Sequence, residues 1–162
     1  MTLVTQIDEL DLPAWSPGVD VEISTDRDRI DTDFVHGFLG GETEWGAGLP
    51  RGILERSIHN SLVVGAYQRD GSQVGFARAI TDYGTFAHIA DVYVLPEWRG
   101  RGVGKRLIEA ILAHPGLQGL RRWSLATRDG QGLYARYGFT PLAEPHMFME
   151  LCPERSPEAS QA

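Results

Sequence analysis

The sequence of 162 residues has a single cysteine, Cys152. One cysteine excludes an internal disulfide and a zinc site made of cysteines, and we expect no metal. No apolar run approaches the roughly 18 residues that a membrane-spanning helix needs. The acidic N-terminus lacks the basic stretch and the apolar segment of a signal peptide. We therefore expect a cytoplasmic protein without a membrane partner.

Positive charge is also scarce, and the shortage is uneven along the chain. The formal net charge is -7, and residues 1–60 hold 12 Asp and Glu against 4 Arg. Proteins that bind nucleic acids through phosphate contacts carry a basic surface, so this charge argues against a general nucleic-acid binder. The acidic first third is either a solvated surface or a face that attracts a cationic partner.

What is present is typical of one globular domain. Hydrophobic residues make up 42% and charged residues 23% of the chain, close to the globular average. No segment repeats, and no composition shift marks a second domain. We predict an N-terminal arm over residues 1–18, a single domain over 19–151, and a disordered Pro- and Glu-rich tail over 152–162.

Apolar periodicity predicts a mixed α/β fold. Helices are expected from Asp31 or Thr32 to Gly40-Gly41, from Pro50 onward with Ile53, Leu54 and Ile58 on one face, and over residues 102–114 and 131–137. An Asp70-Gly71 turn predicts a hairpin between two strands. The predicted strands cover residues 19–24, 61–68, 73–81, 86–94, 123–126, 139–142 and 147–151.

The stretch from Val92 to Lys105 carries the candidate chemistry. A hydrophobic strand runs through Pro96 into a loop rich in glycine and arginine, and an amphipathic helix follows at once. Free N–H groups at a helix N-terminus bind phosphate well, and glycines let the backbone approach the phosphate oxygens. The alternative is a tight turn with incidental arginines. The loop residues are Arg99, Gly100, Arg101, Gly102, Val103, Gly104 and Lys105.

Two common phosphate loops do not match this stretch. The spacing Gly100-x-Gly102-x-Gly104 is not the G-x-G-x-x-G of dinucleotide-binding folds. Lys105 is followed by Arg106, so the lysine and hydroxyl pair of nucleoside-triphosphate loops is missing. A dinucleotide-binding or redox domain is therefore disfavoured.

The loop resembles the acyl-CoA-binding motif of the GNAT (Gcn5-related N-acetyltransferase) superfamily. That motif, [RQ]-x-x-G-x-[GA], is matched by Arg99-x-x-Gly102-x-Gly104 after the segment Val94-Leu95-Pro96. A second segment, GLYARYGF at residues 132–139, is similar to the family's [FL]-Y-x-[KR]-x-G-F. The resemblance implies a mostly antiparallel central sheet that is splayed between its fourth and fifth strands, with flanking helices and with acyl-CoA in the splay.

The resemblance also implies roles for single residues. Backbone groups of Val92, Tyr93 and Val94 would hold the pantetheine arm of acetyl-CoA, and the loop amides from Gly100 to Lys105 would hold the pyrophosphate beside Arg99. Tyr134 matches the tyrosine that protonates the departing CoA thiolate, a role that suits a phenol near a sulfur. The alternative for Tyr134 is ordinary aromatic packing.

The general base is less well defined. Family members often carry a Glu-Asp pair on the fourth strand, and the matching pair here is Ala90-Asp91. Asp91 is our first candidate, although strand alternation turns it to the face opposite Ala90 and a structural role is the alternative. Other candidates are Asp82, Glu42, Glu44 and His88, and a reaction without a dedicated base also stays open.

The acceptor is expected against the first two helices and the loop between them. Phe38, Glu44 and Trp45 are the candidate substrate-binding residues, because an aromatic side chain with nearby carboxylates can hold an ammonium group. A small-molecule amine and a peptide terminus are both open, and the family makes a homodimer plausible. The rival function is a non-catalytic acyl-CoA-binding or regulatory domain, which the alanine at position 90 keeps open.

Overall fold

Five strands form one sheet in the computed structural model, which describes residues 20–41 and 48–153. The sheet follows the chain order β1-β2-β3-β4-β5; every neighbouring pair is antiparallel except β4 and β5, which are parallel. The mixed, mostly antiparallel sheet is thus confirmed. The strands are β1 (Glu22–Ser24), β2 (Leu62–Tyr67), β3 (Gln73–Thr81), β4 (Phe86–Val94) and β5 (Arg122–Leu125).

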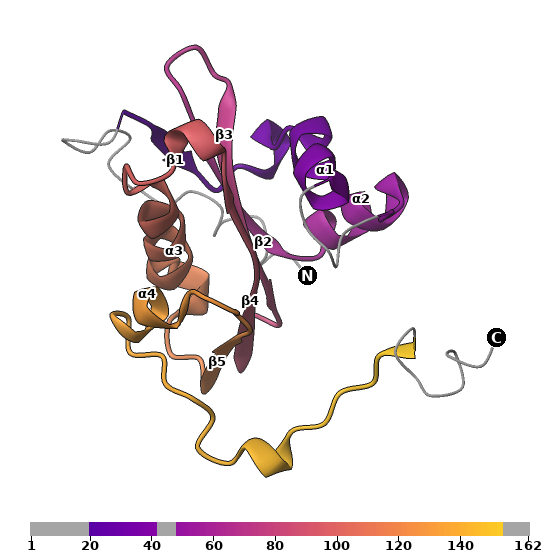
Figure 1. The fold of residues 1–162 in the computed structure, drawn as a ribbon, viewed down its shortest axis with the longest axis vertical. Helices are drawn as coiled ribbons and strands as arrows, with labels where there is room; N and C mark the ends of the chain where they lie inside the picture. Colours follow the sequence, from indigo (N-terminus) through magenta and orange to yellow (C-terminus); the bar gives the residue numbers. More distant parts are fainter. Residues whose placement is uncertain (1–19, 42–47, 154–162) are drawn as a thin grey trace. The chain divides into compact units, whose positions relative to one another are not determined.

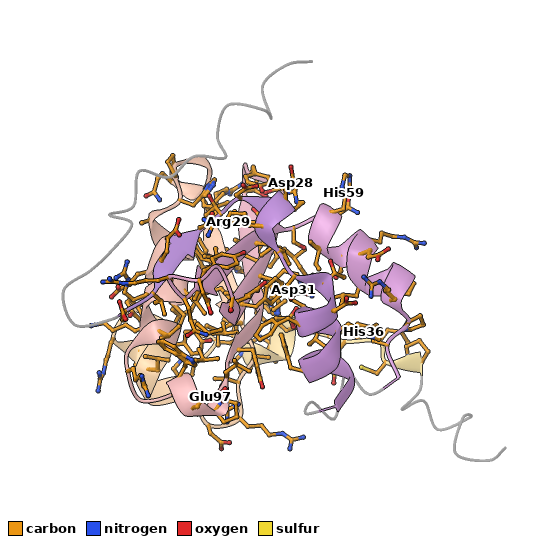
Figure 2. All side chains as sticks on the ribbon, turned by 90° about the horizontal axis from the view of Figure 1, so that it is seen from above. Asp28, Arg29, Asp31, His36, His59 and Glu97 are labelled. Carbon is orange, nitrogen blue, oxygen red and sulfur yellow. The ribbon has the colours of Figure 1, made fainter. Side chains whose placement is uncertain are left out.

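Of the α-helices in the described residues, α1 and α2 begin where capping residues predicted them. Asp31, labelled in Figure 2, precedes α1. Its carboxylate accepts the Phe34 N–H at 3.0 Å. Pro50 precedes α2 and Gly102 precedes α3. The helices are α1 (Thr32–Gly41), α2 (Arg51–His59), α3 (Val103–Ala113) and α4 (Gln131–Ala135); short 3-10 turns cover Arg27–Arg29, Pro96–Trp98, Pro115–Leu117 and Pro145–Met147.

The chain divides into two compact units, residues 1–126 and residues 127–162. In the first unit, α1 and α2 cover one face of the sheet and α3 covers the other (Figure 1). On the α1/α2 face, Val63 of β2 and Phe76 of β3 pack with Phe38 of α1. On the α3 face, Gly75 lies so close to Leu107 that an added Cβ would be 3.1 Å from its Cδ1. Whether residues 19–151 form one domain stays a prediction.

One aromatic side chain bends back over its own strand. Tyr67 lies on β2 with its ring against Gly65, where a Cβ would overlap the phenol group. The guanidinium of Arg29 covers the ring at 4.2 Å from its centroid. The phenol oxygen is buried and has no hydrogen-bond partner within the described residues. Burial raises the pKa of Tyr67 above its ordinary value.

The fourth strand is irregular in the middle. The register passes from Arg78 opposite Asp91 to Ala79 opposite Ile89, so Ala90 is an extra residue, a β-bulge. The strict alternation that we expected between Ala90 and Asp91 therefore does not hold across this point. β5 pairs with β4 only over the four positions from Phe86 to Ile89. Beyond Ile89 the two strands no longer pair, as the splayed sheet requires.

Two of the predicted strands are wrong. Residues 139–142 and 147–151 form no strand; the 3-10 turn Pro145–Met147 and irregular chain take their place. Pro141 and Pro145 supply no N–H to a ladder, and no neighbouring strand exists within the described part of this unit. Met149 and Leu151 are 97% and 87% exposed. Apolar residues alone were therefore not enough to form a strand, because a strand needs a neighbouring strand to pair with.

Other expectations differ in smaller ways. Ile53 is 44% exposed, whereas Leu54 and Ile58 are buried, so only two of the three predicted residues of α2 face the core. The predicted arm over 1–18, the loop residues 42–47 and most of the predicted tail lie outside the described residues. No helix in the described ranges is both long and apolar enough to cross a membrane.

Candidate active site

The free edge of β4 is the first component of the site. On one side, Val92 and Tyr93 pair with Ala77 and Phe76 of β3. On the other side, β5 has already diverged, because its last pairing is Ile89 with Leu125. Alternate backbone groups of residues 90–94 therefore face away from β3, on the side where β5 no longer pairs with β4. An extended, amide-containing ligand can pair with such an edge as an additional strand would.

The glycine loop connects this edge to α3. Gly100 and Gly102 have φ values of 75° and 84°, a left-handed conformation that glycine adopts without strain. Gly102 is the N-cap residue, and no side chain caps the helix. The first N–H groups of α3 consequently lack an acceptor in the helix and carry its positive dipole end. This is the arrangement that the sequence predicted for a phosphate group.

The basic side chains of the loop are held by neighbours. The Nε of Arg99 donates to the Val94 carbonyl oxygen at 2.9 Å, and its guanidinium lies 5.5 Å from the Tyr93 ring centroid. Arg101 lies over Trp98 at 4.9 Å. The ammonium of Lys105 is 3.8 Å from the Glu109 carboxylate, an exposed pair that contributes little stability. Arg99 thus stabilises the end of β4, whereas Arg101 and Lys105 lie at the surface.

One basic residue of α3 was not among the predicted site residues. Arg106 lies one turn after Gly102, and its Nη1 atom is buried without a hydrogen-bond partner in the part of the chain that is described. An unsatisfied guanidinium N–H is costly unless a ligand or water accepts it. In the sequence, Arg106 served only as evidence against a nucleoside-triphosphate-binding loop. Its buried donor fits an anionic ligand at this end of the helix.

Asp91 lies in a buried ion pair. Its carboxylate accepts from the Arg78 Nε at 2.6 Å, and the two side chains are 2% and 13% exposed. Arg78 also donates to the Ser61 hydroxyl at 3.1 Å. The second carboxylate oxygen of Asp91 is buried and makes no hydrogen bond to a described residue. The pair joins β3 to β4 beside the bulge, so a structural role is built into the geometry of Asp91, and its catalytic role stays a prediction.

Two other candidate bases occupy different environments. Asp82 accepts the N–H groups of Gly84, Thr85 and Phe86 and the Thr85 hydroxyl, so these bonds hold its pKa far below the ordinary value. A carboxylate so bound is a weak base and a strong turn cap. His88 of β4 is partly buried, with its Nδ1 atom 2.7 Å from the Ser124 hydroxyl of β5. Burial and the charge of Arg78 lower the pKa of His88, against the opposing effect of Asp91.

Tyr134 belongs to the second unit. It lies on α4, where its ring meets that of Phe139 edge to face at 5.8 Å. A Cβ at Gly130 would be 3.2 Å from the tyrosine ring, so the glycine leaves room for it. Burial raises the pKa of Tyr134 above its ordinary value of 10.0. The phenol therefore stays protonated at neutral pH, as a proton donor must.

Of the predicted acceptor residues, only Phe38 is described. It is 6% exposed and stacks on Tyr93 with 3.9 Å between ring centroids. This places Phe38 in the core, in contact with the strand whose edge is free. Glu44 and Trp45 lie outside the described residues, as does Glu42. The role of all three predicted acceptor residues stays a prediction.

Comparison with known proteins decides the family. The family model described as the acetyltransferase (GNAT) domain matches residues 59–141, which is half of the chain and includes β4, the loop and Tyr134. The chain belongs to the GNAT acetyltransferase family. Membership implies the use of acyl-CoA, which fits the free edge of β4 and the uncapped start of α3.

Relatives of this GNAT chain span most of its length. A solved structure of a candidate acetyltransferase of the same family from Xanthomonas campestris pv. campestris is 52% identical, covers 82% of this chain and 92% of its own, and superimposes with a TM-score of 0.79. A candidate acetyltransferase from Gibberella zeae is 32% identical over 75% of this chain and 79% of its own. A candidate acetyltransferase from Deinococcus radiodurans, 23% identical over 86% of this chain and 93% of its own with a TM-score of 0.63, shares the fold.

Proposed function

We propose that this GNAT protein transfers the acetyl group of acetyl-CoA to a primary amine by direct attack in a ternary complex. The observation that carries the proposal is the continuous path from the part of β4 beyond its last pairing with β5, through Gly100 and Gly102, to the N-terminus of α3, which no side chain caps. Each part of this path offers backbone N–H or C=O groups, and together they match an extended amide chain that ends in a diphosphate.

Each part of the protein then has a task. The backbone of Val92, Tyr93 and Val94 binds the pantetheine amides, and the amides from Gly100 to Lys105 bind the pyrophosphate. The buried donor of Arg106 adds a charged partner for the anion. Holding thioester and amine together supplies much of the rate, because the reaction becomes effectively unimolecular.

Protonation of the leaving group falls to Tyr134 in this proposal. The amine nitrogen forms a bond to the carbonyl carbon, the carbon–sulfur bond breaks, and the phenol proton goes to the sulfur as negative charge develops there. The nitrogen loses a proton to solvent to give the neutral amide, and a proton from solvent restores the phenol. The raised pKa of Tyr134 supports this role, since the proton is present over the physiological range. A small-molecule amine or a peptide terminus as acceptor, a cytoplasmic location and a homodimer remain parts of the proposal.

An acceptor panel is the decisive experiment. The protein is incubated with acetyl-CoA and polyamines, amino acids, aminoglycosides, arylalkylamines and short peptides, and acetylated products are identified by mass spectrometry. We expect an acetylated amine whose formation depends on the protein. CoA binding by calorimetry without any product would instead favour the second candidate, an acyl-CoA-binding domain.

That second candidate rests on one observation. Ala90 takes the position where the family often has its glutamate base, and the adjacent Asp91 is held by Arg78. A chain that binds acyl-CoA without transferring the acyl group needs no base. The two functions differ in turnover, so the same panel separates them.

A further inference from the structure

His88 lies on β4 close to the point where β5 diverges. It pairs with Ile80 of β3, one position from the last rungs that join β4 to β5. Its neighbours Ala87 and Ile89 are buried, and Ile89 pairs with Ala79 on the α3 face. Alternation therefore turns His88 to the opposite face, the one that α1 and α2 cover over β2 and β3. Asp91, beyond the bulge, lies on this face as well, opposite Arg78.

We propose that the Nε2 atom of His88 accepts, directly or through one bound water, the proton that the acceptor ammonium loses before it attacks. The inference rests on the proposed function and supplies the base that Ala90 cannot. Ser124 acts as a positioning residue, because its hydroxyl lies 2.7 Å from Nδ1 and fixes the plane of the ring. In this arrangement Nδ1 carries the hydrogen, Ser124 accepts it, and the Nε2 lone pair is available.

The groups around the two side chains favour His88 over Asp91 as the proton acceptor. Arg78 of β3 and Asp91 of β4 are the charged groups that act on the imidazole, and Ser124 of β5 is its hydrogen-bond partner. Arg78 binds the Asp91 carboxylate at 2.6 Å, so this oxygen is already engaged in a charged hydrogen bond inside the sheet. Burial and Arg78 also keep His88 neutral at pH 7, with its pKa below 6.5.

The proton balance closes without another reactant. The bound ammonium gives one proton to His88 and becomes the neutral amine, which forms the new bond to the carbonyl carbon. The imidazolium later returns that proton to solvent. Tyr134 supplies a separate proton to the CoA sulfur as the carbon–sulfur bond breaks. The nitrogen, which is positively charged once the new bond forms, releases a second proton to solvent and becomes the neutral amide, and a proton from solvent restores the phenol.

The pH dependence of His88→Gln tests the proposal with acetyl-CoA and an amine that the panel identifies. We expect kcat/KM to fall about 10²-fold at pH 7, the scale of one acid–base group. The deficit should shrink about tenfold or more towards pH 9, because more of the amine is then neutral and needs no base. Asp91→Asn should instead lower kcat/KM by a similar factor at every pH. Parallel profiles for wild type and His88→Gln would overturn the proposal.

Three further measurements separate an effect on the chemical step from an effect on folding. Arg121→Gln, at an exposed position just before β5, should keep the wild-type profile. His88→Gln should keep the wild-type CoA affinity by calorimetry, which shows that the sheet is intact. Ser124→Ala should give part of the His88→Gln deficit with the same pH dependence.

A second measurement needs no turnover. Nitrogen-15 NMR of the free protein reports which ring nitrogen of His88 carries the hydrogen. The proposal requires the Nδ1–H form at pH 7, and an Nε2–H form would overturn it. If wild type acetylates no amine, the proposed function fails, and the tautomer still decides whether His88 is arranged as a proton acceptor.

Discussion

At the scale of single residues, a substitution of Tyr134 distinguishes a role in proton transfer from a role in packing. Tyr134→Phe removes the phenol but keeps the ring that meets Phe139 at 5.8 Å. We expect kcat to fall roughly 10²-fold or more, while CoA binding and Tm stay near wild type. Steady-state kinetics and calorimetry measure both quantities. Phe139→Leu, which loses the edge contact but keeps the phenol, is the matched control and should lower Tm more than kcat. A change in kcat under a few-fold in Tyr134→Phe would assign the tyrosine to packing.

Single residues also show where sequence reasoning stops. The loop from Arg99 to Lys105 could be predicted, because its chemistry depends on local backbone and on neighbours in sequence. The pairs Arg78 with Asp91 and His88 with Ser124 could not, since they join residues 13 and 36 positions apart. Both depend on strand register, and the bulge at Ala90 changes the register between them.

At the scale of elements, the turn into α3 is the test of cofactor binding. Gly102→Glu places a carboxylate beside the proposed pyrophosphate and forces a residue with a Cβ to a φ of 84°. A like charge at about 4 Å costs about 1 to 4 kcal/mol, so we expect CoA affinity to fall roughly 5- to 1000-fold. Isothermal calorimetry gives the affinity, and circular dichroism checks the fold.

The control for that variant adds the same charge elsewhere. Gly52→Glu changes an exposed position of α2, where an added Cβ meets no atom within 4 Å. It should leave CoA affinity unchanged. Gly102→Ala adds strain without charge and should fall between the two. Equal affinity of wild type and a folded Gly102→Glu would remove the loop from the cofactor site.

Secondary-structure elements were predicted well where the apolar periodicity and the turn residues at the element ends agree. β3 and β4 have the predicted bounds, and the hairpin between β2 and β3 turns at Gly71 with a φ of 87°. The two missing strands had apolar residues but also Pro141 and Pro145, and a strand needs a partner that sequence periodicity does not supply. In α2 one of the three predicted core residues differs, since Ile53 fits the helical period but is 44% exposed.

At the scale of the whole molecule, the titrating groups predict a stability optimum. Folding lowers the pKa values of Glu22, Asp70, Asp82 and His88, so the unfolded chain binds more protons and acid favours it. Folding raises the pKa values of Tyr67 and Tyr134, so stability is lost as pH rises above 10.0, their ordinary value. We expect the highest Tm between the ordinary values of histidine and tyrosine, 6.5 and 10.0.

Thermal melts from pH 4 to pH 10.5 test this expectation. Tm should fall by several degrees at pH 4, because about 1 kcal/mol corresponds to roughly 2–4 °C in a protein of this size. The part of the loss between pH 7 and 5.5 that belongs to His88 should be missing in His88→Gln. A Tm that rises on acidification would contradict the cited pKa directions.

The sheet order and the family could be expected from the two motifs, because both are local patterns with a fixed order along the chain. The division into two compact units at residue 126 could not, since it depends on which segments contact one another. The described residues of the acidic first third do not share a single role. Two of its carboxylates form ion pairs with arginines of the same third, Glu22 with Arg29 and Asp33 with Arg51.

The close approach of Tyr67 to Gly65 also limits how this sequence can change over evolutionary time. A side chain at position 65 would need the space that the tyrosine ring occupies, and Arg29 above the ring leaves it little room to move. An alanine at 65 is thus open mainly to a lineage that has first replaced the tyrosine at 67. The order of the two substitutions is fixed by their geometry, and in distant descendants the two positions should vary together.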